Sequence, residues 1–245
     1  MSGIDHRVVI VTGASRGLGR EIALHFGASG CRVVINYRER EGDARMVAED
    51  ICRSGGDAFA VRADIRRPDE VDSMVDKALR RWGSIDVLVN NAGVTRDALA
   101  VRMDEADWDS VMDANLKGPF LCMRAASRSM TGQGSGHIIS VASIAGVRGR
   151  DGQANYASSK AGLIGLTKAA AKEFGGANIQ VNCVLPGLLT TDMGAAARER
   201  VHGQVIAETT LGRTSNAVEV AAFILHLSRM QNVSGQVFNL DSRIL

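Results

Sequence analysis

The chain has 245 residues, of which 45% are hydrophobic and 23% are charged, and its formal net charge at pH 7 is +2. These values are typical of a folded globular protein and exclude the disordered and collagen-like classes. The 29 basic and 27 acidic residues are mixed along the chain without a basic arm, so nucleic acid is not expected as a partner.

Short runs rich in β-branched residues alternate with segments of helical character, a pattern typical of βαβ units that form a parallel sheet. The predicted strands lie near residues 8–12, 32–37, 57–63, 86–91, 137–142, 179–184 and 236–240. The predicted helices lie near residues 17–29, 41–54, 69–82, 104–130, 153–174 and 216–230. The alternation predicts one α/β domain over residues 1–245, with a doubly wound, seven-stranded parallel sheet. Residues 188–214 do not follow it and are predicted to form a lid.

The location of the protein follows from its apolar segments and its cysteines. No apolar run approaches the roughly 18 residues of a membrane span, and the run after MSGIDHR is too short for a signal peptide. We therefore expect a cytoplasmic protein with no membrane partner. Four separated cysteines, Cys31, Cys52, Cys122 and Cys183, form no C-x-x-C pair. We expect buried reduced thiols rather than disulfides or a metal site.

The segment TGASRGLG follows the first predicted strand and places Gly13, Gly17 and Gly19 at the start of the first predicted helix. Glycines allow a tight turn and a close approach of a pyrophosphate to the backbone, while the helix N-terminus offers N–H groups and a positive dipole end. The spacing differs from the usual G-x-G-x-x-G, but the strand before it and the helix after it supply the required context. The segment therefore predicts a dinucleotide site, with a structural turn as the alternative.

The residue that distinguishes the two nicotinamide cofactors is expected about 20 residues further on, where an acid would bind the ribose 2′-OH. Asn36, Tyr37 and Arg38 stand there, and the first acid is Glu39. A carboxylate repels the extra phosphate of NADP, whereas Arg38 and Arg16 can form charge-assisted hydrogen bonds with it. We therefore predict NADP(H); the alternative is that both arginines are solvated surface groups.

Tyr156 and Lys160 are four residues apart in a predicted helix, so their side chains share one face. A phenol has a usual pKa of about 10, and a proton donor that works near neutral pH is best placed about three units lower. A lysine cation about 4 Å away supplies an interaction of about that size at an effective dielectric near 20. Ser143, just beyond the strand in HIISVAS, is placed to hydrogen-bond a substrate oxygen. An isolated serine more commonly caps or turns the chain.

Together these segments resemble the short-chain dehydrogenase/reductase family from the first strand to nearly the last residue. The matching segments are TGASRGLG, Ala63-Asp64-Ile65, the NNAG run from Asn90 to Gly93, Asn115, Ser143, the YASSK run from Tyr156 to Lys160, and Pro186-Gly187. The resemblance implies a single-domain Rossmann fold with helices on both faces of the sheet. It also implies an oxidoreductase that acts on a carbonyl/alcohol pair.

The family's roles apply to the matching positions. Tyr156 would be the general acid/base, Lys160 would lower its pKa and bind the nicotinamide ribose, and Ser143 would orient the carbonyl. Asn115 would fix a helix kink and a water in the proton relay, and Asn90 would line the cofactor cleft. The implied cofactor-binding residues, with Asp64 at the adenine, are Thr12, Gly13, Ser15, Arg16, Gly17, Leu18, Gly19, Asn36, Arg38, Ala63, Asp64, Ile65, Asn91, Ala92, Gly93, Tyr156, Lys160, Pro186, Gly187, Leu189 and Thr191.

Within the family, the length and the segments NNAGVTRD, NYASSKAGLIGLTKAAAKE and PGLLTTDM are most similar to 3-oxoacyl-[acyl-carrier-protein] reductases and acetoacetyl-CoA reductases. This resemblance implies reduction by NADPH of a 3-oxoacyl thioester, carried by acyl carrier protein or CoA, as in fatty acid biosynthesis. It also implies a homotetramer built through the helices near 104–130 and 153–174. The chain departs from the family at NLDSR (239–243), where a Gly-Gly pair is common.

The substrate is the part of the prediction that stays most open. The loop TGQGSGH lacks the basic residues that often meet an acidic carrier protein. A positive patch is possible elsewhere, and a solvated helix face is the alternative, at Arg124, Arg128, Lys168 and Lys172. A sugar, polyol, steroid or polyketide is an alternative substrate, because the fold and the tetrad do not set the substrate. A nucleotide-binding protein without catalysis is a more distant alternative.

Overall fold

The computed structural model describes residues 6–189, 203 and 205–244. Within this described part, seven strands form one sheet in the order β3-β2-β1-β4-β5-β6-β7, and every neighbouring pair is parallel. The strands are β1 (Val8–Val11), β2 (Arg32–Tyr37), β3 (Asp57–Arg62), β4 (Val87–Asn90), β5 (Gly136–Val141), β6 (Ile179–Pro186) and β7 (Val237–Leu240). The predicted doubly wound sheet is confirmed. The strand order reverses between β1 and β4, and the crevice at such a switch point is where ligands bind in open α/β sheets.

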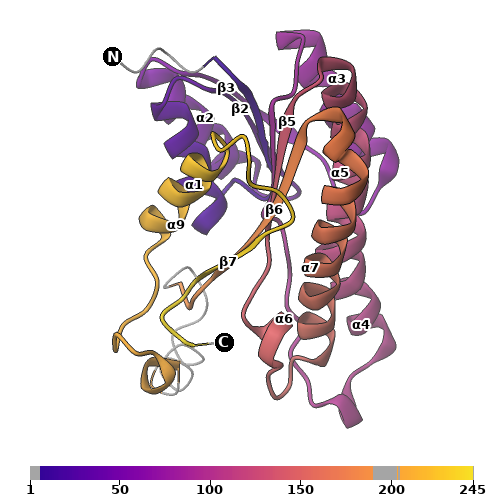
Figure 1. Ribbon diagram of the computed structural model, residues 1–245, viewed down its shortest axis with the longest axis vertical. Helices are drawn as coiled ribbons and strands as arrows, with labels where there is room; N and C mark the ends of the chain where they lie inside the picture. Colours follow the sequence, from indigo (N-terminus) through magenta and orange to yellow (C-terminus); the bar gives the residue numbers. More distant parts are fainter. Residues whose placement is uncertain (1–5, 190–202, 204, 245) are drawn as a thin grey trace.

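Helices cover both faces of the sheet (Figure 1). One face carries α1 (Gly17–Ala28), α2 (Glu41–Arg53) and α9 (Ala217–Leu227), and the other carries α3 (Pro68–Trp82), α5 (Gly118–Gln133) and α7 (Ala154–Phe174). Successive residues of a strand therefore enter different cores: Val8 and Ile10 belong to one, and Val9 and Val11 to the other. Burial on both faces explains why the strands are continuous apolar runs.

The predicted helix near 104–130 is interrupted by a π turn. Helix α4 (Glu105–Met112) continues through this turn (Asp113–Lys117) into α5. Pro119, which has no N–H for the helical ladder, follows the turn almost directly. Such turns inside helices often mark functional sites. Three short elements were not predicted, because each is too short for a periodic pattern: α6 (Ala145–Arg148), η1 (Ala100–Arg102) and η3 (Gly175–Ala177).

The predicted lid lies partly outside the described residues, because 190–202 and 204 are not among them. In its described part, residues 205–208 are helical. Of the cysteines, Cys31, Cys122 and Cys183 are buried as predicted, whereas Cys52 on α2 is exposed, and its thiol donates to the carbonyl of Ala58 (3.6 Å). Among the described residues, we find no helix with the length and apolar character that a membrane crossing requires.

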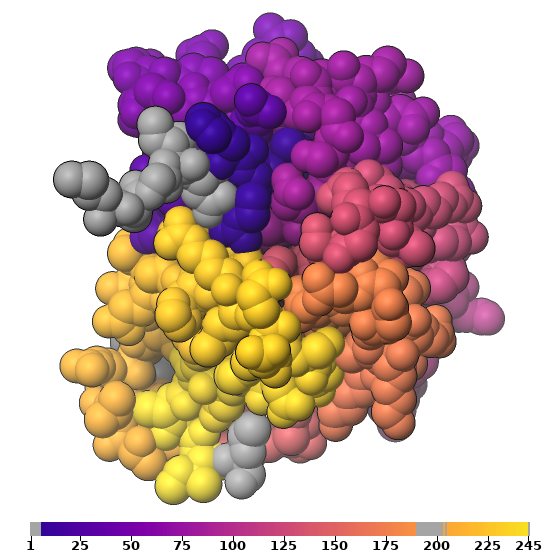
Figure 2. All heavy atoms as spheres, turned by 45° about the horizontal axis from the view of Figure 1, so that its top comes forward, coloured from indigo at the N-terminus to yellow at the C-terminus, as the bar shows by residue number. Residues whose placement is uncertain are grey.

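The C-terminal part of the chain packs between segments that are distant in sequence. Figure 2 shows it in yellow, between the indigo N-terminal region and the orange region of α7. Helix α9 packs against α1, and β7 pairs with β6. This pairing brings the tail after β7 to the same end of the sheet as the tail of β6.

His137 on β5 is a buried base whose protonation opposes folding. Its side chain is 6% exposed, and burial, with the nearby charge of Arg7, lowers its pKa from 6.5 to about 4. Between these values the unfolded chain binds a proton that the folded chain does not. The contribution of His137 to the free energy of unfolding is therefore complete above pH 6.5 and is lost as the pH falls to about 4. A shift of this size corresponds to about 3 kcal/mol.

Denaturant unfolding of His137→Gln tests this effect. We expect the wild-type free energy of unfolding to fall, between pH 7 and pH 4, by about 3 kcal/mol more than that of the variant. His226→Gln, at an exposed position of α9, is the control and should keep the wild-type pH dependence. Parallel pH dependences for the wild type and His137→Gln would contradict the prediction.

Candidate active site

The turn between β1 and α1 leaves no room for side chains. Gly13 and Gly17 have φ values of +63° and +55°, in the left-handed region that favours glycine. A Cβ atom at Gly19 would overlap the carbonyl oxygen of Gly13 and lie 2.5 Å from Nδ2 of Asn91. No side chain caps the N-terminus of α1, so its first N–H groups can bind an anion.

Buried polar side chains support this turn from below. The hydroxyl of Thr12 accepts hydrogen bonds from the N–H groups of Asn91 (3.0 Å) and Ala92 (3.1 Å). Oδ1 of Asn36 accepts one from the N–H of Gly13 (3.2 Å), and its Nδ2 donates to the carbonyl of Ala63 (3.0 Å). Thr12 is fully buried, so its place is beneath the cleft rather than in its lining.

A cleft of about 350 Å³ opens above the turn. Its lining contains most of the predicted cofactor-binding residues: Gly13, Ser15, Arg16, Gly17, Leu18, Gly19, Asn36, Arg38, Ala63, Asp64, Ile65, Asn91, Ala92 and Gly93. It also contains residues that sequence reasoning missed: Tyr37, Glu39, Arg40, Arg66, Val94 and Ala114. The glycine turn, the uncapped helix and this lining fit the adenosine and phosphate groups of a dinucleotide.

Charged groups surround the adenosine end of the cleft. Nη2 of Arg38 lies 2.5 Å from Oε1 of Glu39, and both side chains are exposed. Nε of Arg66 donates to Oδ1 of Asp64 at 2.9 Å, and this hydrogen bond lowers the pKa of the Asp64 carboxyl. Arg16 is exposed, and no described carboxylate forms an ion pair with it. The cleft therefore contains three exposed arginines, Arg16, Arg38 and Arg40, of which Arg38 and Arg40 each pair with an acidic side chain.

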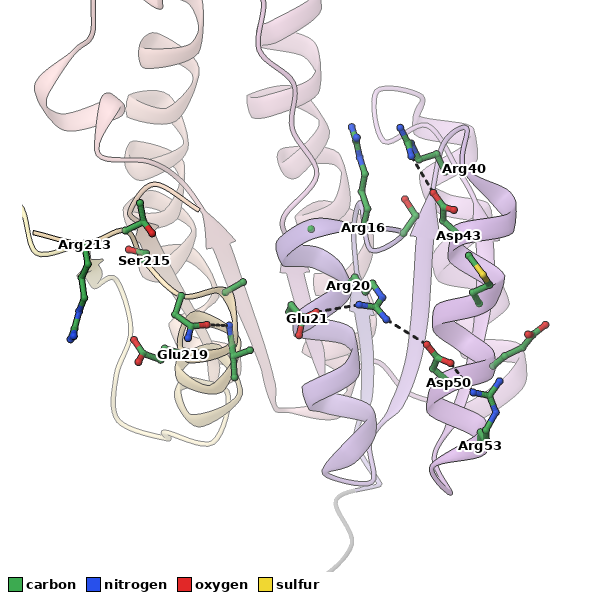
Figure 3. A pocket seen from close by; sticks show the side chains of 18 residues that line it. Arg16, Arg20, Glu21, Arg40, Asp43, Asp50, Arg53, Arg213, Ser215 and Glu219 are labelled. Carbon is green, nitrogen blue, oxygen red and sulfur yellow. Dashed lines mark hydrogen bonds and ion pairs between the residues drawn. The ribbon is translucent and has the colours of Figure 1, made fainter. Parts of the chain in front are cut away.

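A larger groove, of about 1380 Å³, lies beside the cleft between α1, α2 and residues 213–219 (Figure 3). Arg20 forms ion pairs with Glu21 (3.4 Å) and Asp50 (3.6 Å) across it. Arg16 and Arg40 point in the same direction at one end of it. None of the predicted catalytic residues lines this groove or the smaller cleft, but Gly93 in the lining of the cleft lies next to Asn115 and Lys160. No described residue in the lining of the groove has such a neighbour. Its size alone therefore does not make it the site of chemistry.

Three predicted catalytic residues meet at the carboxyl end of β5. Ser143 follows this strand, and its hydroxyl is near enough to the phenol of Tyr156 to lower the pKa of that group. It also accepts from the N–H of Ala145 (3.2 Å), so it both turns the chain and contacts the phenol. Lys160, one turn further along α7, is 4% exposed. Its Nζ donates to the carbonyl of Val141 (2.8 Å) and lies 5.6 Å from the centroid of the Tyr156 ring.

Asn115, the fourth, lies in the π turn and joins three segments. Its Oδ1 accepts from the N–H of Val94 (2.8 Å), and its Nδ2 donates to the carbonyl of Val94 (2.9 Å) and to Oγ of Ser159 (3.2 Å). A Cβ atom at Gly93 would lie 3.1 Å from Oδ1 of Asn115 and 3.6 Å from Nζ of Lys160. Asn115 therefore ties the NNAG loop, the π turn and α7 together beside Lys160.

Burial controls the pKa values of the pair on α7. It raises the pKa of Tyr156, the hydrogen bond with Ser143 opposes this rise, and the charge of Asp97 adds to it. Protein atoms surround the phenol, although the residue keeps some exposed surface. Burial lowers the pKa of Lys160 from 10.5 to about 8. Lys160 is not among the causes of the Tyr156 pKa shift, and its ammonium group donates to the carbonyl of Val141. The lowering of the tyrosine pKa by Lys160 therefore stays a prediction. At neutral pH, Tyr156 is therefore a protonated donor.

Some predicted cofactor residues lie outside the cleft lining. Pro186 ends β6, and the N–H of Gly187 donates to Oγ of Ser215 (3.1 Å). Leu189 forms an isolated bridge with Ser215, and Thr191 lies outside the described residues. The prediction that Asn90 lines the cleft is wrong, because its amide is buried on β4.

A supporting residue beside Tyr156 was also missed. Oδ1 of Asn155 accepts from the N–H of Tyr156 (2.7 Å), and its Nδ2 donates to the carbonyl of Arg96 (2.9 Å). This buried amide holds the first turn of α7 to the loop after β4. No sequence pattern marks it, because an asparagine in a first helical turn commonly interacts with its own backbone.

Comparisons with known proteins agree with this geometry. The model of the short chain dehydrogenase family matches residues 7–202. A 3-oxoacyl-[acyl-carrier-protein] reductase of Synechocystis sp. is 43% identical over 245 residues, which cover 98% of both chains. A protein of the same name from Staphylococcus aureus is 42% identical over 234 residues, 95% of both chains. The solved structure of a short-chain alcohol dehydrogenase from Sinorhizobium meliloti superimposes with a TM-score of 0.92 at 30% identity, covering 99% of this chain and 96% of that one.

Proposed function

Because the chain belongs to the short chain dehydrogenase family, we propose that it reduces a 3-oxoacyl thioester to the 3-hydroxyacyl thioester with NADPH. Two relatives that are 42–43% identical over at least 95% of this chain carry the name 3-oxoacyl-[acyl-carrier-protein] reductase, and this supports the substrate class. The cluster of Tyr156, Ser143, Lys160 and Asn115 beside the glycine-lined cleft is the observation on which the proposal depends.

Each residue of the cluster has a separate task. When bound, the reduced nicotinamide supplies a hydride to the carbonyl carbon. Tyr156, protonated at neutral pH, donates its proton to the carbonyl oxygen, which becomes the hydroxyl of the product. The hydroxyl of Ser143 hydrogen-bonds with the same oxygen as negative charge develops on it. Lys160 places a positive charge beside the phenol, and Asn115 holds the NNAG loop against α7.

The direction of the reaction agrees with these protonation states. Reduction of a ketone consumes a proton, and oxidation of an alcohol needs a base. A phenol whose pKa lies above its usual value is fully protonated at neutral pH, so its proton is present for reduction, whereas the phenolate that oxidation would need as a base is almost absent. We therefore assign reduction as the favoured direction at neutral pH.

The test of this proposal follows the loss of reduced cofactor with acetoacetyl-CoA as substrate. We expect turnover with NADPH preferred over NADH, because Arg16 and Arg38 lie in the cleft where the 2′-phosphate would bind. Arg38→Leu should lower the ratio of kcat/KM for NADPH to that for NADH by about 10- to 100-fold, the range for one hydrogen bond to a charged group. Glu39→Gln should raise the ratio, because it removes the carboxylate that pairs with Arg38.

Arg53→Leu is the matched control for Arg38→Leu. Arg53 is an exposed arginine of α2 that pairs with Asp50 outside the smaller cleft. Its replacement should therefore leave the ratio of kcat/KM for NADPH to that for NADH unchanged. A wild-type preference for NADH would overturn the assignment of Arg16 and Arg38. Absence of turnover with either cofactor would overturn the thioester substrate.

We further propose a cytoplasmic homotetramer that accepts its substrate from acyl carrier protein or CoA. The exposed rings of Trp108 (36%) on α4 and Phe120 (44%) on α5 support a subunit interface at these helices.

The four basic residues considered for contact with an acidic carrier protein differ in their partners. Arg124 stacks over Phe120, and Arg128 pairs with Asp72 (3.7 Å). All four cations are exposed, and among the described residues Lys168 and Lys172 form no ion pair, so these two support contact with an acidic carrier.

A further inference from the structure

The end of β7 and the tail after it, residues 239–243, form a closed turn of their own. The N–H of Asp241 donates to Oδ1 of Asn239 (3.1 Å), and Nδ2 of Asn239 donates to the carbonyl of Arg243 (2.9 Å). The N–H of Arg243 in turn donates to Oδ1 of Asp241 (3.1 Å). Three hydrogen bonds made by the side chains of Asn239 and Asp241 therefore hold the segment NLDSR in one conformation.

A buried ion pair lies at the centre of this turn. The side chains of Asp241 and Arg243 are 3% and 10% exposed. Nε of Arg243 donates to Oδ2 of Asp241 at 2.7 Å, and Nη2 forms a second, shorter bond to the same oxygen. Loss of one partner from such a pair leaves an uncompensated buried charge. The pair therefore favours a single geometry of the tail.

Asp241 packs against Gly187, one of the predicted cofactor-binding residues. A Cβ atom at Gly187 would overlap Oγ of Ser215 (2.2 Å) and lie 2.9 Å from Cγ and Oδ2 of Asp241, so only glycine fits between this hydroxyl and the carboxylate. The hydroxyl of Ser215 joins the two segments, because it accepts from the N–H of Gly187 (3.1 Å) and donates to the carbonyl of Leu240 (3.1 Å). The tail thus supports the backbone that follows β6.

The tail also reaches the segment next to Ser143. Oε2 of Glu208 lies 4.0 Å from Nη1 of Arg243 and 3.7 Å from Nη1 of Arg148. Arg148 is the last residue of α6, which begins two residues after Ser143. Both the N–H (3.3 Å) and the hydroxyl (2.7 Å) of Thr210 donate to the carbonyl of Ser242. One series of contacts therefore connects Gly187, the tail, Glu208 and α6.

We propose that Asp241 and Arg243 are positioning residues for the proposed reaction. Asp241 sets the backbone of Gly187 at the nicotinamide end of the cofactor site, and Arg243 acts through Glu208 on Arg148 and so on α6 beside Ser143. The inference rests on the proposed function, because the proposed function places the cofactor next to Gly187 and the substrate next to α6. The buried charge pair then has a role beyond stability: it orders two segments that must be held in place for catalysis.

The test combines kinetics with amide hydrogen exchange of the full-length protein. The variants are Arg243→Met, Asp241→Asn and Glu208→Gln, and Arg213→Met is the control, since it removes an exposed arginine of the same segment. In Arg243→Met and Asp241→Asn, we expect amide exchange in residues 186–189 and 205–215 to accelerate by about tenfold or more, while exchange in α3 stays unchanged. The KM for NADPH and for acetoacetyl-CoA should rise by about tenfold, with kcat within about threefold of the wild type.

The other variants separate the effect on Gly187 at the cofactor site from the effect on α6 beside Ser143. Glu208→Gln changes a half-exposed side chain and should raise only the KM for acetoacetyl-CoA. Arg243→Lys should restore part of the lost affinity, because one ammonium group can still pair with Asp241. Arg213→Met should behave as the wild type.

Two results would overturn the inference. One is wild-type exchange and wild-type KM values in both Arg243→Met and Asp241→Asn. The other is a lower melting temperature with unchanged KM values for the folded variants, which would make the pair a stabilising contact only. If the wild type itself does not reduce acetoacetyl-CoA, the proposed function fails. Exchange at Gly187 and residues 205–215 then still shows whether the pair orders these segments.

Discussion

Replacing Tyr156 by phenylalanine is expected to lower kcat for acetoacetyl-CoA reduction by roughly 10²–10⁴-fold, the range for loss of a general acid. The change removes only the hydroxyl, whose side-chain partner is Ser143. The ring and its contact with Lys160 (5.6 Å) are retained. The affinity for NADPH should stay within a few-fold of the wild type, because the phenol donates its proton to the substrate.

The measurement compares steady-state reduction with NADPH binding followed by fluorescence. Thermal unfolding of the variant shows whether the fold is intact, and we expect a melting temperature close to that of the wild type. Binding of NADPH together with the loss of turnover identifies a defect in proton transfer. Clear turnover by Tyr156→Phe would exclude the phenol as the proton donor.

Replacing Lys160 by methionine is expected to lower kcat by about 10²-fold, a loss typical of one electrostatic group in a site, and to change its pH dependence. Burial lowers the pKa of Lys160 to about 8, so the ammonium is present below this pH and is lost above it. The pKa of Tyr156 is raised, so the phenol stays protonated over this range. Reduction by the wild type should therefore decline as the pH rises through about 8, and Lys160 rather than Tyr156 should set this decline.

The experiment records kcat from pH 6 to pH 10 for the wild type, Lys160→Met and Lys77→Met. Lys77 is an exposed lysine of α3, and its replacement should preserve the decline near pH 8. Lys160→Met should show no decline there. A decline near pH 8 that persists in Lys160→Met would assign it to another group.

Local sequence patterns predicted most elements of the fold. Continuous apolar strands and amphipathic helices repeat with periods that depend only on neighbouring residues, and the structure has every predicted strand within about two residues of its predicted bounds. Periodicity did not predict the π turn before Pro119, because a helical pattern does not record one extra residue in the ladder. Only the family resemblance implied a kink, at Asn115. Helix α6 escaped it because four residues carry no period.

The residues of the candidate site fall into the same two groups: those that a local sequence pattern predicts, and those that only the folded chain brings together. The glycine turn and the pair of Tyr156 and Lys160 are each set within a few residues of chain, so their spacing alone made them recognisable. Asn155 carried no such signal, because its partner Arg96 is distant in sequence.

By itself, the sequence determined the order of the elements, the parallel sheet, the glycine turn and the spacing of the two residues on α7, because local dihedral angles and side-chain periodicity govern all of these. Only the tertiary structure decided the direction of the pKa shifts at Tyr156 and Lys160, since burial by segments distant in sequence sets the desolvation of each group. The same holds for the contact of Asp241 with Gly187. Neither residue reveals the other in the sequence, because the pairing of β6 with β7 brings them together.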